Sequence, residues 1–317
     1  MISANFQGTF PLLRTAAYFV PDRLWDNWFR LALICPFWRT ECPEKITAKG
    51  WFSPFETQGS LEYDLSCQDK RMKSKNTQEK QAKKNQAISA LVLFSGGIDS
   101  TTALYWALKR YQKVQPVIFD YGQRHRVEIK MAKKACQRLG LEPKIIKVDL
   151  RQIGGSALTD EKIAVPEFRK TGQIKDGLPA TYVPFRNGIF IALGAALAET
   201  LYLADLICGF NVIDSPDYPD TTRSFVRAME KAINEGTGAR FKTEKFRIIA
   251  PFISLKKSEI IRLGLSLGAD YSYSVSCYAG GEIPCGQCSS CLLRAQAWRE
   301  AGEEDHLVRR LKKERKI

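Results

Sequence analysis

Short apolar runs alternate with longer segments of mixed polarity along residues 87 to 317 of the chain. The short runs are rich in β-branched residues and predict strands at residues 88–94, 114–120, 144–150, 206–210 and 246–252. The longer segments predict helices at residues 100–111, 126–139, 188–201, 222–234 and 256–267. Alternating strands and helices are typical of a parallel sheet covered by helices on both faces. We therefore expect an α/β fold built on a doubly wound, five-stranded parallel sheet.

Residues 1–71 differ from the rest of the chain. Their apolar residues do not recur with the period of a strand or of a helix over any sustained length. Their acidic and basic residues are equal in number. We treat them as an N-terminal extension of unknown role, followed by a basic linker or leader at residues 72–87. A start of translation at Met72 would leave the extension outside the native protein. An appended domain or an organellar extension fits the same residues equally well.

Composition excludes several classes of protein. Of the 317 residues, 44% are hydrophobic and 26% are charged, which is ordinary for a soluble globular chain and unlike a disordered or collagen-like one. No stretch approaches the roughly 18 uninterrupted apolar residues that span a bilayer. We therefore expect no membrane partner. The nine cysteines lack a disulfide-framework spacing, which favours the reducing cytoplasm over secretion. The net charge of +14 lies entirely after residue 71 and favours polyanionic ligands.

A glycine turn follows the first predicted strand and precedes a helix, in the order Ser95-Gly96-Gly97-Ile98-Asp99-Ser100-Thr101. Free backbone N–H groups and the positive end of the helix dipole converge at such a turn and create an anion site. Gly96 and Gly97 allow close backbone approach and a positive φ. The turn lacks the ending of the Walker loop, which disfavours γ-phosphate transfer. The alternative is a ligand-free turn in which Asp99 caps the helix.

Four cysteines are clustered near the C-terminus: Cys277, Cys285, Cys288 and Cys291. Four thiolates suit tetrahedral Zn²⁺ and leave no open position for a catalytic water. We expect one structural zinc ion per chain that fixes a loop and contributes to folding. An iron–sulfur cluster would use the same ligands, and four unligated cysteines are the remaining alternative.

The turn at residues 95–100 resembles the pyrophosphate loop of the N-type ATP pyrophosphatases, the PP-loop superfamily. This superfamily has a Rossmann-like fold, adenylates its substrate and releases pyrophosphate. The resemblance implies that ATP binds with Mg²⁺, which the Asp99 carboxylate suits, and that Ser95, Asp99 and Ser100 act in catalysis. It assigns ATP binding to Phe94, Ser95, Gly96, Gly97, Ile98, Asp99, Ser100, Thr101, Thr102, Ala103 and Leu104.

Three further segments, at residues 119–125, 181–187 and 214–220, narrow the resemblance. Together with the phosphate loop and the four cysteines, they make residues 89–299 similar to the QueC family of queuosine biosynthesis. That family implies a C–N bond-forming ligase that converts 7-carboxy-7-deazaguanine, ammonia and ATP into 7-cyano-7-deazaguanine through an adenylated acid and an adenylated amide. It also implies a homodimer. We accordingly place one catalytic domain at residues 88–300 and a charged tail at residues 301–317.

The same segments contain the candidate substrate contacts: Asp120, Tyr121, Arg124, Arg186, Asn187 and Asp217. Asp120 and Tyr121 would lie at the carboxyl end of a parallel strand, where open α/β sheets bind ligands. The forked donors of Arg186 suit a phosphate or a carboxylate, although a surface Arg beside a helix-start Asn has the same sequence. The Asp217 carboxylate suits acceptance of hydrogen bonds from a guanine-like base, and an aspartate at this position equally suits a turn without ligand contact. His125 suits proton transfer, a cap or a surface position.

Two rival functions remain. A PP-loop tRNA thiolase would also adenylate its substrate, but it needs a catalytic cysteine, and Cys136 and Cys208 lie within a predicted helix and a predicted strand. A nucleic-acid-binding module with a zinc knuckle would explain the charge and not the phosphate loop. We therefore expect no stable nucleic-acid partner.

Overall fold

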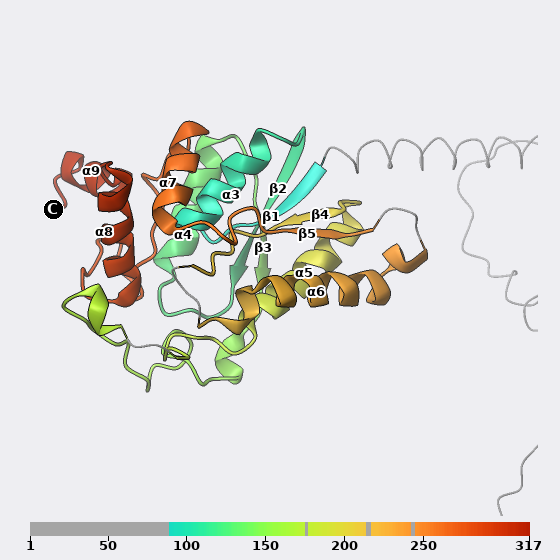
Figure 1. The fold of residues 1–317 in the computed structure, drawn as a ribbon, viewed down its shortest axis with the longest axis horizontal. Helices are drawn as coiled ribbons and strands as arrows, with labels where there is room; N and C mark the ends of the chain where they lie inside the picture. Colours follow the sequence, from blue (N-terminus) through green and yellow to red (C-terminus); the bar gives the residue numbers. More distant parts are fainter. Residues whose placement is uncertain (1–88, 175–176, 214–216, 242–244) are drawn as a thin grey trace, which may run out of the picture. The chain divides into compact units, whose positions relative to one another are not determined.

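The computed structural model describes residues 89–174, 177–213, 217–241 and 245–317. The predicted extension at residues 1–71 and the linker at residues 72–87 lie outside this range. Within it, five strands form one sheet in the order β3-β2-β1-β4-β5, and every neighbouring pair is parallel (Figure 1). The strands are β1 (Ser89–Leu93), β2 (Lys113–Asp120), β3 (Lys144–Lys147), β4 (Asp205–Ile207) and β5 (Arg247–Ile249). The predicted five-stranded parallel sheet is confirmed.

Seven α-helices accompany the sheet in the described residues: α3 (Ile98–Leu108), α4 (Val127–Arg138), α5 (Arg186–Thr200), α6 (Arg223–Gly236), α7 (Lys257–Ser266), α8 (Ser289–Ala301) and α9 (His306–Lys313). Short 3₁₀ turns stand at η1 (Leu150–Gln152), η2 (Thr171–Gln173), η3 (Pro219–Thr221) and η4 (Gly238–Phe241). Gly140 and Gly268 adopt positive φ just beyond α4 and α7, as expected of helix stops.

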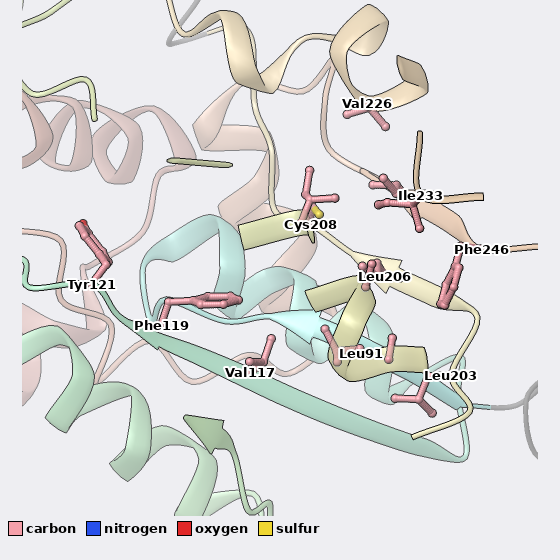
Figure 2. Packing of buried hydrophobic residues seen from close by; sticks show 14 of the residues in the cluster. Leu91, Val117, Phe119, Tyr121, Leu203, Leu206, Cys208, Val226, Ile233 and Phe246 are labelled. Atoms are coloured by element: carbon pink, nitrogen blue, oxygen red, sulfur yellow. The ribbon is translucent and has the colours of Figure 1, made fainter. Parts of the chain in front are cut away.

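Both faces of the sheet are buried, and β1 shows how a continuous apolar strand serves both. Its side chains alternate between two clusters, because successive residues of a strand point to opposite faces. Ala90 and Val92 pack with residues of α3, α4 and α7. Leu91 packs on the other side with residues of α5 and α6, in the cluster drawn in Figure 2. Helices therefore cover both faces, as a doubly wound sheet requires.

Sheet order places a switch point beside β1. From β1 the chain passes to β2 and then β3 on one side, and it returns to β4 and β5 on the other. Connections that leave in opposite directions open a crevice at the carboxyl ends of the two central strands. The loops after β1 and β4 border this crevice.

The two C-terminal helices, α8 and α9, were not predicted, and the charged tail expected at residues 301–317 contains α9. Leu307 and Leu311 of α9 are buried with Met131 of α4. Asp305 caps α9 and also accepts a bond of 2.8 Å from Arg294 Nη2 of α8. Two apolar residues spaced four apart among lysines and arginines form a narrow buried stripe, which the high charge of the segment conceals.

Among the residues that the structure describes, no helix combines the length and the apolar character that a bilayer crossing needs.

Shortening Leu311 should test whether α9 belongs to the folded domain. The side chain is fully buried, so Leu311→Ala should lower the free energy of unfolding by about 2–4 kcal/mol. Lys313→Ala, on the exposed side of the same helix, is the control and should change it by less than about 0.5 kcal/mol. Chemical denaturation measures both values. Equal stability of the two variants would mean that α9 contributes no core packing.

Candidate functional site

The phosphate loop connects β1 to α3, and the start of α3 faces the crevice with its backbone N–H groups. Gly97 is the residue that caps this helix, and it has no side chain to accept those N–H groups. Ser95 Oγ lies 3.1 Å from Ser100 Oγ, and Ser100 Oγ donates to the Gly97 carbonyl over 3.1 Å. The hydroxyls therefore brace the loop while the helix terminus stays open to an anion.

Two glycines let other backbones approach this loop. Gly96 has φ +82°, and a Cβ there would lie 3.0 Å from the Ala132 side chain of α4. Gly209 follows β4, and a Cβ there would lie 2.8 Å from the carbonyl of Asp99. The positive φ expected at Gly97 is wrong, because its φ is −72° with extended backbone. Gly97 instead keeps the space above the helix terminus free of a side chain.

Asp99 is held from one side only. Lys257 Nζ, at the start of α7, donates to Asp99 Oδ2 over 2.8 Å. The other oxygen, Oδ1, is buried and has no hydrogen-bond partner in the described residues. An orphaned carboxylate oxygen beside an anion site fits a divalent cation that bridges phosphate oxygens. Nothing in the local sequence marks Lys257 as a site residue, since only the fold brings α7 to the loop.

A cavity of about 490 Å³ lies over the loop, at the carboxyl ends of the central strands. Its lining combines three groups of residues. The phosphate loop contributes Phe94, Ser95, Gly97, Ile98, Asp99 and Ser100. The predicted substrate contacts contribute Tyr121, Arg186, Asn187 and Asp217. His125, for which proton transfer was one of three interpretations, also lines the cavity, together with residues that the sequence did not indicate: Glu128, Lys257, Tyr278, Ser289, Ser290 and Arg294. The volume is within the range of sites for small molecules and cofactors.

Arg186 presents a guanidinium without an acidic partner to this cavity. Its Nη1 donates to the Tyr121 hydroxyl over 3.3 Å, and the guanidinium carbon lies 5.7 Å from the Tyr121 ring centre and 6.0 Å from that of Phe190. No carboxylate of the described residues pairs with it. Burial raises the pKa of Tyr121 to about 12, so that hydroxyl stays protonated. The remaining donors of Arg186 suit a ligand carboxylate or phosphate.

The chain is strained where it places Arg186. Phe185, the preceding residue, has φ 53° and ψ 22°, a left-handed conformation that is costly for an aromatic residue. The backbone N–H of Asn187 donates to Asp220 Oδ2 over 3.0 Å, which ties the start of α5 to η3. These contacts set the beginning of α5, and hence Arg186, against the cavity.

The structure does not bring every predicted residue to the cavity. Asp120 pairs with Arg126 at 2.8 Å, and Arg124 Nη2 donates to the carbonyls of Asp160 and Ile163. Thr102 is buried within α3, where its hydroxyl lies 2.6 Å from that of Tyr271. The second half of the predicted ATP segment, Thr101 to Leu104, is core of α3 and outside the lining. Asp214, Ser215 and Pro216 of the third segment lie outside the described residues.

The four predicted cysteines converge as a metal site would require. Their sulfurs all lie within 4.8 Å of one another, and those of Cys285 and Cys291 are 3.9 Å apart. A tetrahedral ion with metal–sulfur bonds of about 2.3 Å separates its sulfurs by about 3.8 Å, so the residues fit a zinc ion. The backbone N–H of Cys288 donates to the sulfur of Cys285 over 3.4 Å. Such donors stabilise thiolates, which are the form that binds metal.

The cysteine cluster adjoins the cavity through α8. Cys288 is the N-terminal cap of α8, and Cys291 lies in its first turn. Ser289 and Ser290, between these two cysteines, line the cavity. An antiparallel bridge from Glu167 to Cys288 and a bond of 2.8 Å from Phe168 N to Gln287 O also attach the loop before η2 to the cluster.

Adding one methyl group at Gly209 tests whether the close approach of its backbone to that of Asp99 is needed for ligand binding. Gly209→Ala would place carbon 2.8 Å from the Asp99 backbone and push β4 away from the loop. We expect the affinity for ATP with Mg²⁺ to fall at least about tenfold, a loss of about 1.4 kcal/mol, measured by titration calorimetry. Gly236→Ala, where an added Cβ meets nothing within 4 Å, should leave it unchanged. Equal affinities of the two variants would contradict this account.

Comparisons with known proteins agree with the resemblance found in the sequence. The family model for the queuosine biosynthesis protein QueC matches residues 89–302. A 7-cyano-7-deazaguanine synthase of Thermoplasma acidophilum is 45% identical over 218 residues, which are 69% of this chain and 90% of that protein. One of Trichodesmium erythraeum is 42% identical over 222 residues, 70% of this chain and all of that protein. The solved structure of NMN synthetase from Francisella tularensis has a TM-score of 0.37 at 15% identity, covering 71% of this chain and 82% of its own. The matches from residue 89 onward show that the chain belongs to the QueC family of queuosine biosynthesis proteins.

Proposed function

We propose that this protein is a ligase that converts 7-carboxy-7-deazaguanine, ammonia and ATP into 7-cyano-7-deazaguanine. The observation that carries the proposal is one cavity lined both by an open helix terminus suited to phosphates and by the guanidinium of Arg186. The reaction brings two anions together, a nucleoside triphosphate and a carboxylate. The names and the extent of similarity of the relatives support this choice of substrate.

Activation of the carboxylate comes first. A carboxylate oxygen attacks the α-phosphorus of ATP, the bond to the bridging oxygen breaks, and pyrophosphate leaves with that electron pair. The N–H groups at the start of α3 bind the phosphates, where negative charge accumulates, and the hydroxyls of Ser95 and Ser100 brace the loop that presents them. Arg186 and the Tyr121 hydroxyl hold the carboxylate in line. When bound, Mg²⁺ supplies further charge neutralisation at this position, with Asp99 Oδ1 as its protein ligand.

Nitrogen enters at the acyl adenylate. Ammonia attacks the acyl carbon, AMP leaves, and an amide results. In a second round the amide oxygen attacks the α-phosphorus of another ATP, and loss of AMP leaves the nitrile. Asn187 and Asp217 offer an amide and a carboxylate to the base of the substrate. We propose free ammonia as the nitrogen source and a homodimer as the assembly, as the family resemblance implies.

Buried cysteines argue against the rival tRNA thiolase within the described part of the chain. Cys136 and Cys208 are both fully buried. Burial raises the pKa of the Cys136 thiol to about 12 and that of Cys208 further still. A sulfur carrier needs an accessible thiolate, and neither residue supplies one.

Product analysis tests the proposed reaction. We expect the wild-type protein to form the nitrile with AMP and pyrophosphate, because attack falls on the α-phosphorus. Asp99→Asn should lower the rate at least about 100-fold, since it removes charge at the phosphate loop. Asp149→Asn is the control, because that carboxylate is exposed and pairs with Arg151. Mass spectrometry and nucleotide chromatography provide the readout. ADP and phosphate as the nucleotide products would contradict the mechanism.

Zinc content tests the proposed metal. Elemental analysis should find about one zinc ion per chain, and Cys288→Ser should remove it and lower the yield of folded protein. Cys136→Ser is the control, since it also replaces a buried cysteine but should retain the zinc. Iron with a visible absorption band would instead identify an iron–sulfur cluster.

A further inference from the structure

Three side chains after β2, those of Gln123, His125 and Glu128, form a hydrogen-bonded chain beside the cavity. His125 Nε2 lies 3.1 Å from Glu128 Oε2. Gln123 Nε2 donates to the other oxygen, Glu128 Oε1, over 2.9 Å. Gln123 Oε1 in turn accepts from the backbone N–H of Tyr121 over 2.9 Å. The carboxylate of Glu128 is thus fixed from one side by Gln123 and faces the imidazole on the other.

The other imidazole nitrogen has no partner. Only 4% of His125 is exposed, and its Nδ1 is buried without a hydrogen bond in the described residues. Because the Glu128 carboxylate accepts from Nε2–H, the neutral imidazole has its lone pair on Nδ1. His125 and Glu128 both line the cavity, together with Tyr121, Arg186 and Asp99. A buried, carboxylate-oriented imidazole with an unpaired nitrogen has the arrangement of a general base.

The proposed reaction requires such a base, because all three hydrogens of ammonia must leave as protons when the nitrile forms. We propose that His125 is the general base that removes these protons at Nδ1, and that Glu128 is the positioning residue that holds its imidazole. This inference rests on the proposed function and adds to it the residue that handles the protons.

The three protons of ammonia leave in three separate steps. The nitrogen lone pair forms the C–N bond, the C–O bond to AMP breaks with its electron pair, and one N–H proton passes to Nδ1, leaving the amide. When the amide oxygen has displaced pyrophosphate from the second ATP, a second N–H proton leaves. The last proton departs as the second C–O bond breaks and the triple bond closes, with AMP as the leaving group. Nδ1 must release each proton to solvent before accepting the next.

Other titratable groups at the cavity are less suited to this role. Lys257 and Asp99 are paired with each other. Burial raises the pKa of Tyr121 to about 12, and it also raises the pKa of Tyr278, whose ring centre lies 5.8 Å from that of His125. Asp217 is a carboxylate of the described cavity lining and is therefore the rival base that the experiment must separate from His125.

The experiment separates adenylation from proton removal. Attack of a carboxylate on ATP transfers no proton, so exchange of labelled pyrophosphate into ATP, dependent on 7-carboxy-7-deazaguanine and without ammonia, reports the first step alone. In His125→Asn we expect this exchange to stay within about threefold of wild type. Amide and nitrile formation should fall at least about 100-fold, the usual contribution of a general base. Nitrile formation from the supplied amide should fall likewise.

Three further variants test whether the loss in His125→Asn comes from the missing base. Glu128→Gln keeps an acceptor for Nε2–H and loses the charge, and it should lower nitrile formation about tenfold without affecting exchange. His306→Gln removes the chain's other histidine, which lies outside the cavity, and should leave the ratio of the two rates unchanged. In His125→Ala, added imidazole should restore part of the nitrile formation, which a purely structural role would not allow.

Several results would overturn the inference. These are nitrile formation within threefold of wild type in His125→Asn, an equal loss of exchange and nitrile formation, or a selective loss of nitrile formation in Asp217→Asn but not in His125→Asn. A folded wild-type protein with neither exchange nor nitrile would instead refute the proposed function. His125→Gln serves in place of His125→Asn if the latter does not fold.

Discussion

The approach of two backbones at Gly209 is the constraint on which the site depends. β1 and β4 pair in parallel, with Leu91 opposite Leu206, so both strands end at the same edge of the sheet. The turn after β4 then meets the start of α3, and a side chain at residue 209 would collide with the Asp99 carbonyl. Because backbone packs directly on backbone here, the N–H groups of α3 remain available to a ligand. The anion site is thus a property of the main chain, to which Ser95, Asp99 and Lys257 add charge and hydroxyls.

The cysteine cluster adjoins the same cavity through α8. A metal with four thiolate ligands would have no position left for substrate, so its effect on the proposed reaction would be indirect. That effect would be on geometry, because Cys288 and Cys291 flank the serines that line the cavity. Further along α8, Arg294 donates to Asp305, which caps α9. Through α8, the cavity wall, the cysteine cluster and the C-terminal helix therefore share one support.

Local sequence signals predicted the sheet, the phosphate loop and the cysteine cluster, because each depends on residues close together in the chain. Contacts between distant segments were beyond their reach. Lys257 reaches Asp99 across 158 positions of sequence, and nothing around either residue indicates the pairing. Arg124 shows the converse, since its place in a family segment suggested substrate and its guanidinium is occupied by loop carbonyls. Helix α9 was hidden because its stripe of two leucines is narrow and most of its remaining residues are lysines and arginines.

Of two cationic side chains that line the cavity, Lys257 is paired with a carboxylate and Arg186, within the described part of the chain, is not. This difference suits a substrate that is a carboxylate in the first round of the proposed reaction and an amide in the second. Lys257 is neutralised by Asp99, whereas the Arg186 guanidinium contacts a hydroxyl and two aromatic rings and no carboxylate among the described residues. Cation–π contacts provide about 0.5–2 kcal/mol, less than the desolvation that a guanidinium meets on burial. Arg186 is therefore best matched when a ligand supplies an acceptor oxygen. In the proposed reaction that oxygen belongs to a carboxylate in the first round and to an amide in the second. Both are planar and each presents an oxygen that accepts from a guanidinium N–H, two oxygens in the carboxylate and the single carbonyl oxygen in the amide, so one guanidinium can orient the attacking oxygen in each adenylation.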